Sequence, residues 1–190
     1  MSFNWEGIGG LTSRSYTCGY CDRPLASERG WRSRFPNGQV TGYIYVCHQC
    51  QSPTFFDEII KSQTPGVTFG HSVNDIPEKD IENLYDEARK TTGAGAYTAT
   101  VLCCRKLLMH IAVSKGAPAG KAFIDYVQFL ADKNYIPPDA KGWVDHIRTK
   151  GNEANHEIVL MAKGDAEDLL SFIEMLLKVI YEFPAAIKKK

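Results

Sequence analysis

The sequence predicts an α+β fold that is mainly α, with a small N-terminal module of strands followed by a helical domain. Two Cys-x-x-Cys pairs lie among the first 56 residues, and a β-branched and aromatic run occupies residues 40–46. From about residue 77 onward the apolar residues recur with a helical period instead. Every basic residue before Lys61 is an arginine, so the composition changes where the pattern changes. We therefore expect domains at residues 1–60 and 77–190, joined by a linker at 61–76.

The composition excludes several broad classes of protein. The 190 residues contain 22 Lys plus Arg and 22 Asp plus Glu, which gives a formal net charge of zero. A polycation that coats nucleic acid and an acidic disordered tail are both excluded. No apolar run reaches the roughly 18 to 20 residues that cross a bilayer, and the first residues lack the basic and apolar regions of a signal peptide. We expect a cytoplasmic protein with no membrane partner, whose six cysteines are thiols or metal ligands.

Four N-terminal cysteines, Cys18, Cys21, Cys47 and Cys50, form two pairs that are separated by 25 residues. This spacing predicts a structural Zn²⁺ site, because each Cys-x-x-Cys turn directs two sulfurs at one ion and a β-hairpin brings the turns together. A zinc ribbon of this size needs the ion in order to fold. The alternatives are an iron–sulfur cluster, a redox pair or chance. His48 could replace one cysteine, but four thiols already complete the set, so we interpret His48 as a bystander.

The strand module interleaves arginines with aromatic residues. Residues 1–56 hold five arginines against three acidic residues, a net charge of +2, which leaves −2 for the remainder. Arginine beside exposed aromatic side chains suits phosphate contact and base stacking. The alternative is that Trp31 and Phe35 form the only core of the module while the arginines are merely solvated. The candidate nucleic-acid-binding residues in this module are Arg23, Trp31, Arg32 and Arg34.

Gly and Pro residues divide the second domain into helices. Asp75 is the candidate N-terminal cap of the first helix. The last helix is the clearest, because an apolar stripe that starts at Leu169 advances by three and four residues until Pro184 ends it. The other helices are predicted at about residues 77–92, 96–114, 121–133 and 139–150.

Arg148, Asn152 and His156 are spaced by four, so a continuous helix would place all three on one face. If Gly151 breaks that helix, Asn152 caps the next one. Arginine binds phosphate and histidine moves a proton near neutral pH. One hypothesis is therefore a metal-independent ribonuclease in which Arg148 and His156 are catalytic and Asn152 positions them. The other hypothesis is a polar junction whose side chains satisfy helix ends.

Residues 147–156 read IRxxGNxAxH, and this motif resembles a bacterial family called domain of unknown function 4145. Residues 85–88, 95–97 and 105–108 agree with that family as well. The resemblance implies an all-helical bundle related to the HEPN superfamily, whose members include ribonuclease toxins and phage-defence components. It also implies that a module with two Cys-x-x-Cys pairs is a common N-terminal companion.

The same resemblance implies a homodimer that acts on RNA or DNA, beside a partner enzyme of a defence system. HEPN ribonucleases carry an Arg, a polar residue and then a His after four to six intervening positions, whereas Arg148 and His156 have seven between them. Arg105 and His110 have four, but positions five apart on a helix point about 140° apart. We expect Arg105 to support Arg148 in nucleic-acid binding. The alternative function is a non-catalytic dimeric adaptor for nucleic acid or protein.

Overall fold

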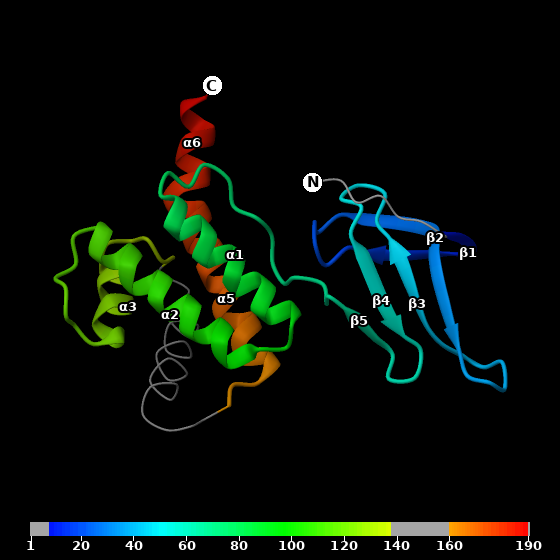
Figure 1. Ribbon diagram of the computed structural model, residues 1–190. Helices are drawn as coiled ribbons and strands as arrows, with labels where there is room; N and C mark the ends of the chain where they lie inside the picture. The colour runs from blue at the N-terminus through cyan, green and yellow to red at the C-terminus, as the bar shows by residue number, and fades with distance from the viewer. Residues whose placement is uncertain (1–7, 138–159, 190) are drawn as a thin grey trace. The chain divides into compact units, whose positions relative to one another are not determined.

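The computed structural model describes residues 8–137 and 160–189. The chain divides into two compact units, residues 1–68 and 69–190. The first unit is an antiparallel sheet and the second is a group of helices (Figure 1). The expected order of strands followed by helices is confirmed. The helix predicted at about 139–150 lies outside the described residues.

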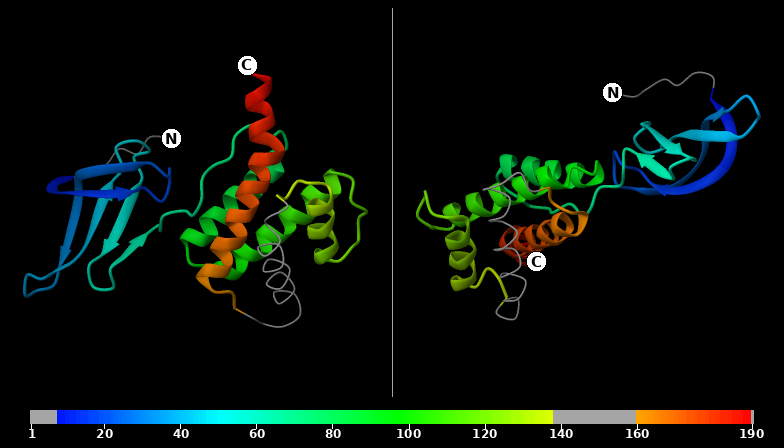
Figure 2. Two further views of the ribbon diagram at one scale, coloured as in Figure 1. Left: turned by 180° about the vertical axis from the view of Figure 1, so that it is seen from behind. Right: turned by 90° about the horizontal axis from the view of Figure 1, so that it is seen from below.

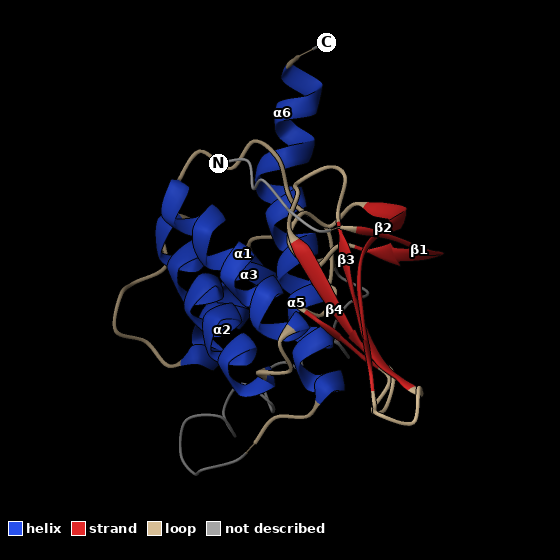
Figure 3. Cartoon of the chain, turned by 45° about the vertical axis from the view of Figure 1, so that its right-hand side comes forward, coloured by secondary structure: helices blue, strands red, loops and turns tan. Residues whose placement is uncertain are grey.

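The sheet contains five strands that pair in chain order, each antiparallel to the next (Figure 3). The predicted hairpin corresponds to β2 and the central strand β3. The sequence did not reveal the outer strands, because β1 and β5 are mostly polar and join the sheet through backbone pairing. The strands are β1 (Gly9–Thr17), β2 (Pro24–Arg34), β3 (Val40–Val46), β4 (Pro53–Asp57) and β5 (Ser62–Thr64).

The core of the sheet unit is formed by tyrosine and phenylalanine rings on one face. Tyr45 and Phe56 are buried, and the centroid of the Tyr16 ring lies 5.1 Å from that of Phe56. The hydroxyl of Tyr45 donates to the carbonyl of Thr12, and the Arg14 guanidinium stacks 4.1 Å from the centre of the Phe56 ring. The first strand therefore curls over this face and closes it.

The interpretation of Trp31 and Phe35 as the only core of this unit is wrong. Phe35 is 45% exposed at the end of the β2–β3 hairpin, and Trp31 is half-buried. The reason is the register of the strands, which pairs Tyr45 with Gly30 and leaves Trp31 on the opposite face.

The segment predicted as a linker, residues 61–76, is structured at both of its ends. Its first part forms β5, which pairs with β4. Further along, the Arg89 guanidinium donates to the carbonyls of Phe69 and Gly70, which holds the segment against the helices. These contacts come from residues elsewhere in the chain, so the local pattern of Gly, Pro and polar residues did not indicate them.

The helical unit is built around α2 (Tyr97–Ser114), which packs against α1 (Lys79–Gly93), α3 (Phe123–Asp132) and α5 (Lys163–Leu177) (Figure 2). Three of the predicted helices match α1, α2 and α3 to within about two residues. The core contains most of the buried apolar side chains among the described residues, including Leu108, Ile111, Phe172 and Leu176. No helix within the described residues has both the length and the apolar character that a membrane span requires.

Two predicted helix ends are corrected. The N-cap of α1 is Glu78, whereas Asp75 has a positive φ and accepts a hydrogen bond from Lys189. Pro184 does not end the last helix, which continues as a π-helical turn, η2 (Lys178–Glu182), and then α6 (Phe183–Lys188). The π turn interrupts the i to i−4 pattern, so Pro184 falls in the first turn of α6, where its missing N–H breaks no helical bond.

Candidate functional site

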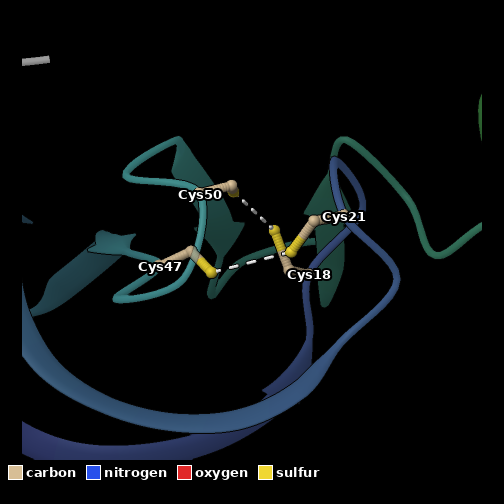
Figure 4. A group of neighbouring side chains, drawn as sticks. All are labelled: Cys18, Cys21, Cys47 and Cys50. Carbon is tan, nitrogen blue, oxygen red and sulfur yellow. Dashed lines mark hydrogen bonds between the residues drawn. The ribbon is translucent and has the colours of Figure 1, made fainter. Parts of the chain in front are cut away.

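The four N-terminal cysteines converge at one end of the sheet, from the β1–β2 and β3–β4 turns. Figure 4 shows their side chains pointing toward one another. All four sulfurs lie within 4.8 Å of one another, with Cys18 Sγ 3.7 Å from Cys50 Sγ and Cys21 Sγ 3.9 Å from Cys47 Sγ. Cys18 and Cys47 are fully buried. This closed set of four sulfurs has a geometry that could bind one metal ion.

The two knuckles that carry the cysteines are built in the same way. In the first, the amide of Asp22 donates to the carbonyl of Cys18, and in the second the amide of Gln51 donates to the carbonyl of Cys47, both at 2.9 Å. Asp22 and Gln51 both adopt a left-handed backbone, with φ of 57° and 59°. The first cysteine of each knuckle also donates its amide to the residue five positions later, at 3.0 Å. Two copies of one turn thus present two sulfurs each to a common centre.

The environment of the thiols is uneven. Burial raises the pKa of Cys18, and it raises the pKa of Cys21 to about 12. Burial acts on Cys50 in the same direction, but hydrogen bonds with Ser52, Cys21 and Cys47 together outweigh it and lower the pKa of Cys50 to about 7. A metal ion binds thiolates, so its binding here must be accompanied by proton release from the protonated thiols.

The candidate nucleic-acid-binding residues of the sheet unit do not form one cluster. Arg23 donates to Oε1 of Gln49 on the second knuckle, and Arg34 donates to the carbonyl of Gly38 in the hairpin turn. Arg32 is exposed and lies next to Trp31 on β2, so these two side chains point to opposite faces of the sheet. The structure therefore spreads the arginines over the surface of this unit.

Arg105 is not at the surface, where a contact with nucleic acid would require it. Arg105 is only 5% exposed, its guanidinium stacks 4.1 Å from the centre of the Phe123 ring, and burial lowers its pKa. Nη1 of Arg105 has no hydrogen-bond partner among the described residues. The remaining candidates, Arg148, Asn152 and His156, lie outside the described residues.

A polar network that the sequence did not indicate surrounds Glu174 on α5. Its carboxylate accepts hydrogen bonds from the amide of His71, at 2.9 Å, and from Nζ of Lys178, and it lies 3.2 Å from Nδ1 of His71. Burial raises the pKa of Glu174, but these donors outweigh burial and lower it overall. The adjoining open pocket measures about 440 Å³ and is lined by both polar and apolar residues, among them Glu174, Lys178, Phe69 and Met175.

Comparison with known proteins identifies the helical unit. The sequence model of a domain of unknown function, DUF4145, matches residues 86–190, which is more than half of the chain. The chain is a member of the DUF4145 family. The DUF4145 region begins inside α1 and includes α2, α3, α5 and α6, whereas the sheet with its four cysteines precedes the match. Searches of curated proteins and of solved structures found no match.

Proposed function

We propose that this DUF4145 protein binds nucleic acid through its sheet unit. The observation that carries the proposal is an unneutralised positive charge on β2. Arg29 and Arg32 are exposed and have no ion-pair partner among the described residues. By contrast, the positive charges of Arg14 and Lys61 on the same unit are paired with the carboxylate of Glu58. Free guanidinium groups on an exposed strand suit the phosphates of a nucleic acid backbone.

We further propose that Zn²⁺ occupies the four-cysteine centre and makes the sheet unit a zinc ribbon. Cys18, Cys21, Cys47 and Cys50 would hold the ion, and the matching construction of the two knuckles supports a tetrahedral arrangement. Four protein sulfurs leave no open position for a substrate, so the role of the ion is structural. When bound, Zn²⁺ joins the β1–β2 turn to the β3–β4 turn and fixes the end of the sheet.

For the helical unit the proposal follows the resemblance of DUF4145 to the HEPN superfamily. The unit would be a HEPN-like bundle that forms a homodimer and acts beside a partner enzyme of a phage-defence system. Ribonuclease activity through Arg148, Asn152 and His156 rests on the sequence motif alone, because these residues lie outside the described part of the chain. The non-catalytic binding role is therefore the form of the proposal that the described contacts support best.

Fluorescence anisotropy with labelled RNA and DNA tests the proposed function. Binding should weaken as the salt concentration rises from about 50 to 200 mM, because binding releases cations from the phosphates and added salt opposes that release. Arg29→Ala should weaken binding and reduce the salt slope by about 1.

Lys61→Ala is the matched control, since it removes one exposed positive charge that already pairs with Glu58. It should change the affinity less than Arg29→Ala does. An absence of binding to every RNA and DNA tested, or binding that is insensitive to salt, would contradict the proposed function.

A further inference from the structure

We propose that the nucleic acid is single-stranded and that its bases stack on one face of the sheet, on a row formed by Trp31, Ile44 and Phe55. We call these three residues the exposed row. The inference rests on the proposed nucleic-acid-binding function and specifies the form of the ligand and its place on the sheet unit.

The register of the strands defines the exposed row. Trp31 on β2 lies directly opposite Ile44 on β3, and Ile44 lies directly opposite Phe55 on β4. Directly opposite residues of an antiparallel pair project to the same face, and neighbouring strands lie about 4.8 Å apart. The three side chains therefore form an apolar line across the middle of the sheet.

Two members of the exposed row, Ile44 and Phe55, are open to solvent, whereas Trp31 is half-buried. Ile44 is 36% exposed and Phe55 is 39% exposed, whereas Tyr45 and Phe56, their neighbours along the strands, are buried in the core. Both faces of this small sheet thus carry large apolar side chains, but the first strand covers only one of them. Apolar area that a fold leaves in water across three strands is typical of a surface that binds a partner.

A glycine beside the exposed row positions the ring of Phe55. A Cβ atom at Gly42 would lie 2.7 Å from Cε2 of Phe55, so the ring rests against the bare backbone of β3. Any larger residue at position 42 would push the ring away. Because the backbone supports one side of the Phe55 ring, the ring is already fixed before a flat ligand binds to its exposed side. Binding therefore costs little conformational entropy.

Charge indicates the chemistry of that ligand. Arg29 lies two residues before Trp31 on β2, so strand alternation places it on the same face as the exposed row. Arg29 is exposed and has no ion-pair partner among the described residues. Aromatic rings with a neighbouring guanidinium suit a chain of flat bases linked by phosphates. A duplex hides the faces of its bases in its own stack, so only an unpaired strand can use the exposed row.

The experiment compares the affinity of zinc-loaded full-length protein for an oligothymidylate of about 12 nucleotides, for an oligouridylate of the same length, and for the oligothymidylate in a duplex. We expect the single strands to bind more tightly than the duplex. Phe55→Leu keeps an apolar side chain but removes the ring, and it should weaken single-strand binding about tenfold with little effect on the duplex. Phe183→Leu is the matched control, because Phe183 is 53% exposed on the helical unit and should leave both affinities unchanged.

The outcomes separate this inference from the proposed function. If no nucleic acid binds, both fail. If binding depends on Arg29 and on salt but Phe55→Leu does not change it, or if the duplex binds more tightly, only the single-strand inference is overturned. Should Phe55→Leu lose its metal or its fold, Trp31→Leu provides the same comparison. Self-association that Ile44→Asp abolishes without changing nucleic acid affinity would assign the exposed row to a second copy of the chain and overturn the inference.

Discussion

At the scale of single residues, Glu174 fastens the segment that follows residue 68 to α5. Its carboxylate accepts hydrogen bonds from the amide of His71 and the ammonium of Lys178, and its side chain is only 14% exposed. Gly70 makes this approach feasible, since a Cβ there would lie 2.7 Å from Oε2 of Glu174 and its φ of +70° suits glycine. The glycine and the carboxylate are 104 positions apart in the sequence, so no local pattern connects them.

Glu174→Gln should destabilise the helical unit by about 1–2 kcal/mol at pH 7, because the charged acceptor for the amide of His71 and the ammonium of Lys178 is lost. The pKa of Glu174 is lowered in the folded protein, so its stabilising contribution is complete above its ordinary value of 4.5 and is lost as the pH falls through the lower folded value. The difference in unfolding free energy between the two proteins should therefore shrink as the pH falls below 4.5. Urea unfolding at several pH values measures it.

Glu167→Gln is the control, because Glu167 also lies on α5 and pairs with Lys163 four residues away, but at 3.7 Å. Its effect on stability should be a few tenths of a kcal/mol, about the value of an exposed helical pair. A difference between Glu174→Gln and the parent protein that is equally large at pH 3 and pH 7 would show that the charge of Glu174 does not stabilise the fold.

At the scale of elements, the stability of the sheet depends on its two cysteine knuckles more than the stability of the helices depends on any single turn or cap. Among the described residues, the sheet unit has few fully buried side chains, whereas the helical unit has a large continuous core. A small sheet with so little buried apolar area needs a crosslink to be stable. The two knuckles provide the sulfurs for one.

We expect elemental analysis to find one zinc per chain, and Cys47→Ser to lower this content and unfold the sheet unit. The far-ultraviolet helical signal should largely persist, because the helical core contains no residue of the sheet unit. Cys103→Ser, which changes a half-buried thiol on α2 outside the cluster, is the matched control and should keep its zinc. Iron with visible absorbance, or full zinc occupancy in Cys47→Ser, would contradict the assignment. Cooperative loss of the whole helical signal would contradict the independence of the units.

Elements differed in how far the sequence predicted them. The four-cysteine centre was found from spacing, because two identical turns need only local residues, and β3 was found from its β-branched and aromatic run. The pairing of Trp31, Ile44 and Phe55 was not found, because a register depends on which strands become neighbours. Pro184 was misjudged because the π turn before it, Lys178–Glu182, has no signal in the apolar stripe.

At the scale of the whole molecule, the proposed catalytic role is tested by one substitution. If the protein is a ribonuclease, His156→Ala should abolish cleavage of RNA, because the general acid or base is removed, and should leave the dimer mass and the melting temperature nearly unchanged. Gel assays with several RNAs, sizing by light scattering and thermal melts measure these quantities. His110→Ala is the control, since His110 is an exposed histidine on α2 that pairs with Glu78. Retained cleavage in His156→Ala, or none in the parent protein, contradicts ribonuclease activity through His156.

The docked segment before α1 has a practical consequence for expressing the helical domain by itself. A fragment that begins at residue 77, where the helical pattern starts, would lack the backbone groups that Tyr85, Arg89 and Glu174 bind. Each of these side chains would then lose a hydrogen-bond partner at the edge of the core. This loss favours aggregation and degradation of the expressed fragment. A recombinant boundary at Phe69 retains all three partners, and it also retains Asn74, whose amide Glu182 binds. Soluble yield therefore depends on eight residues that carry no helical signal.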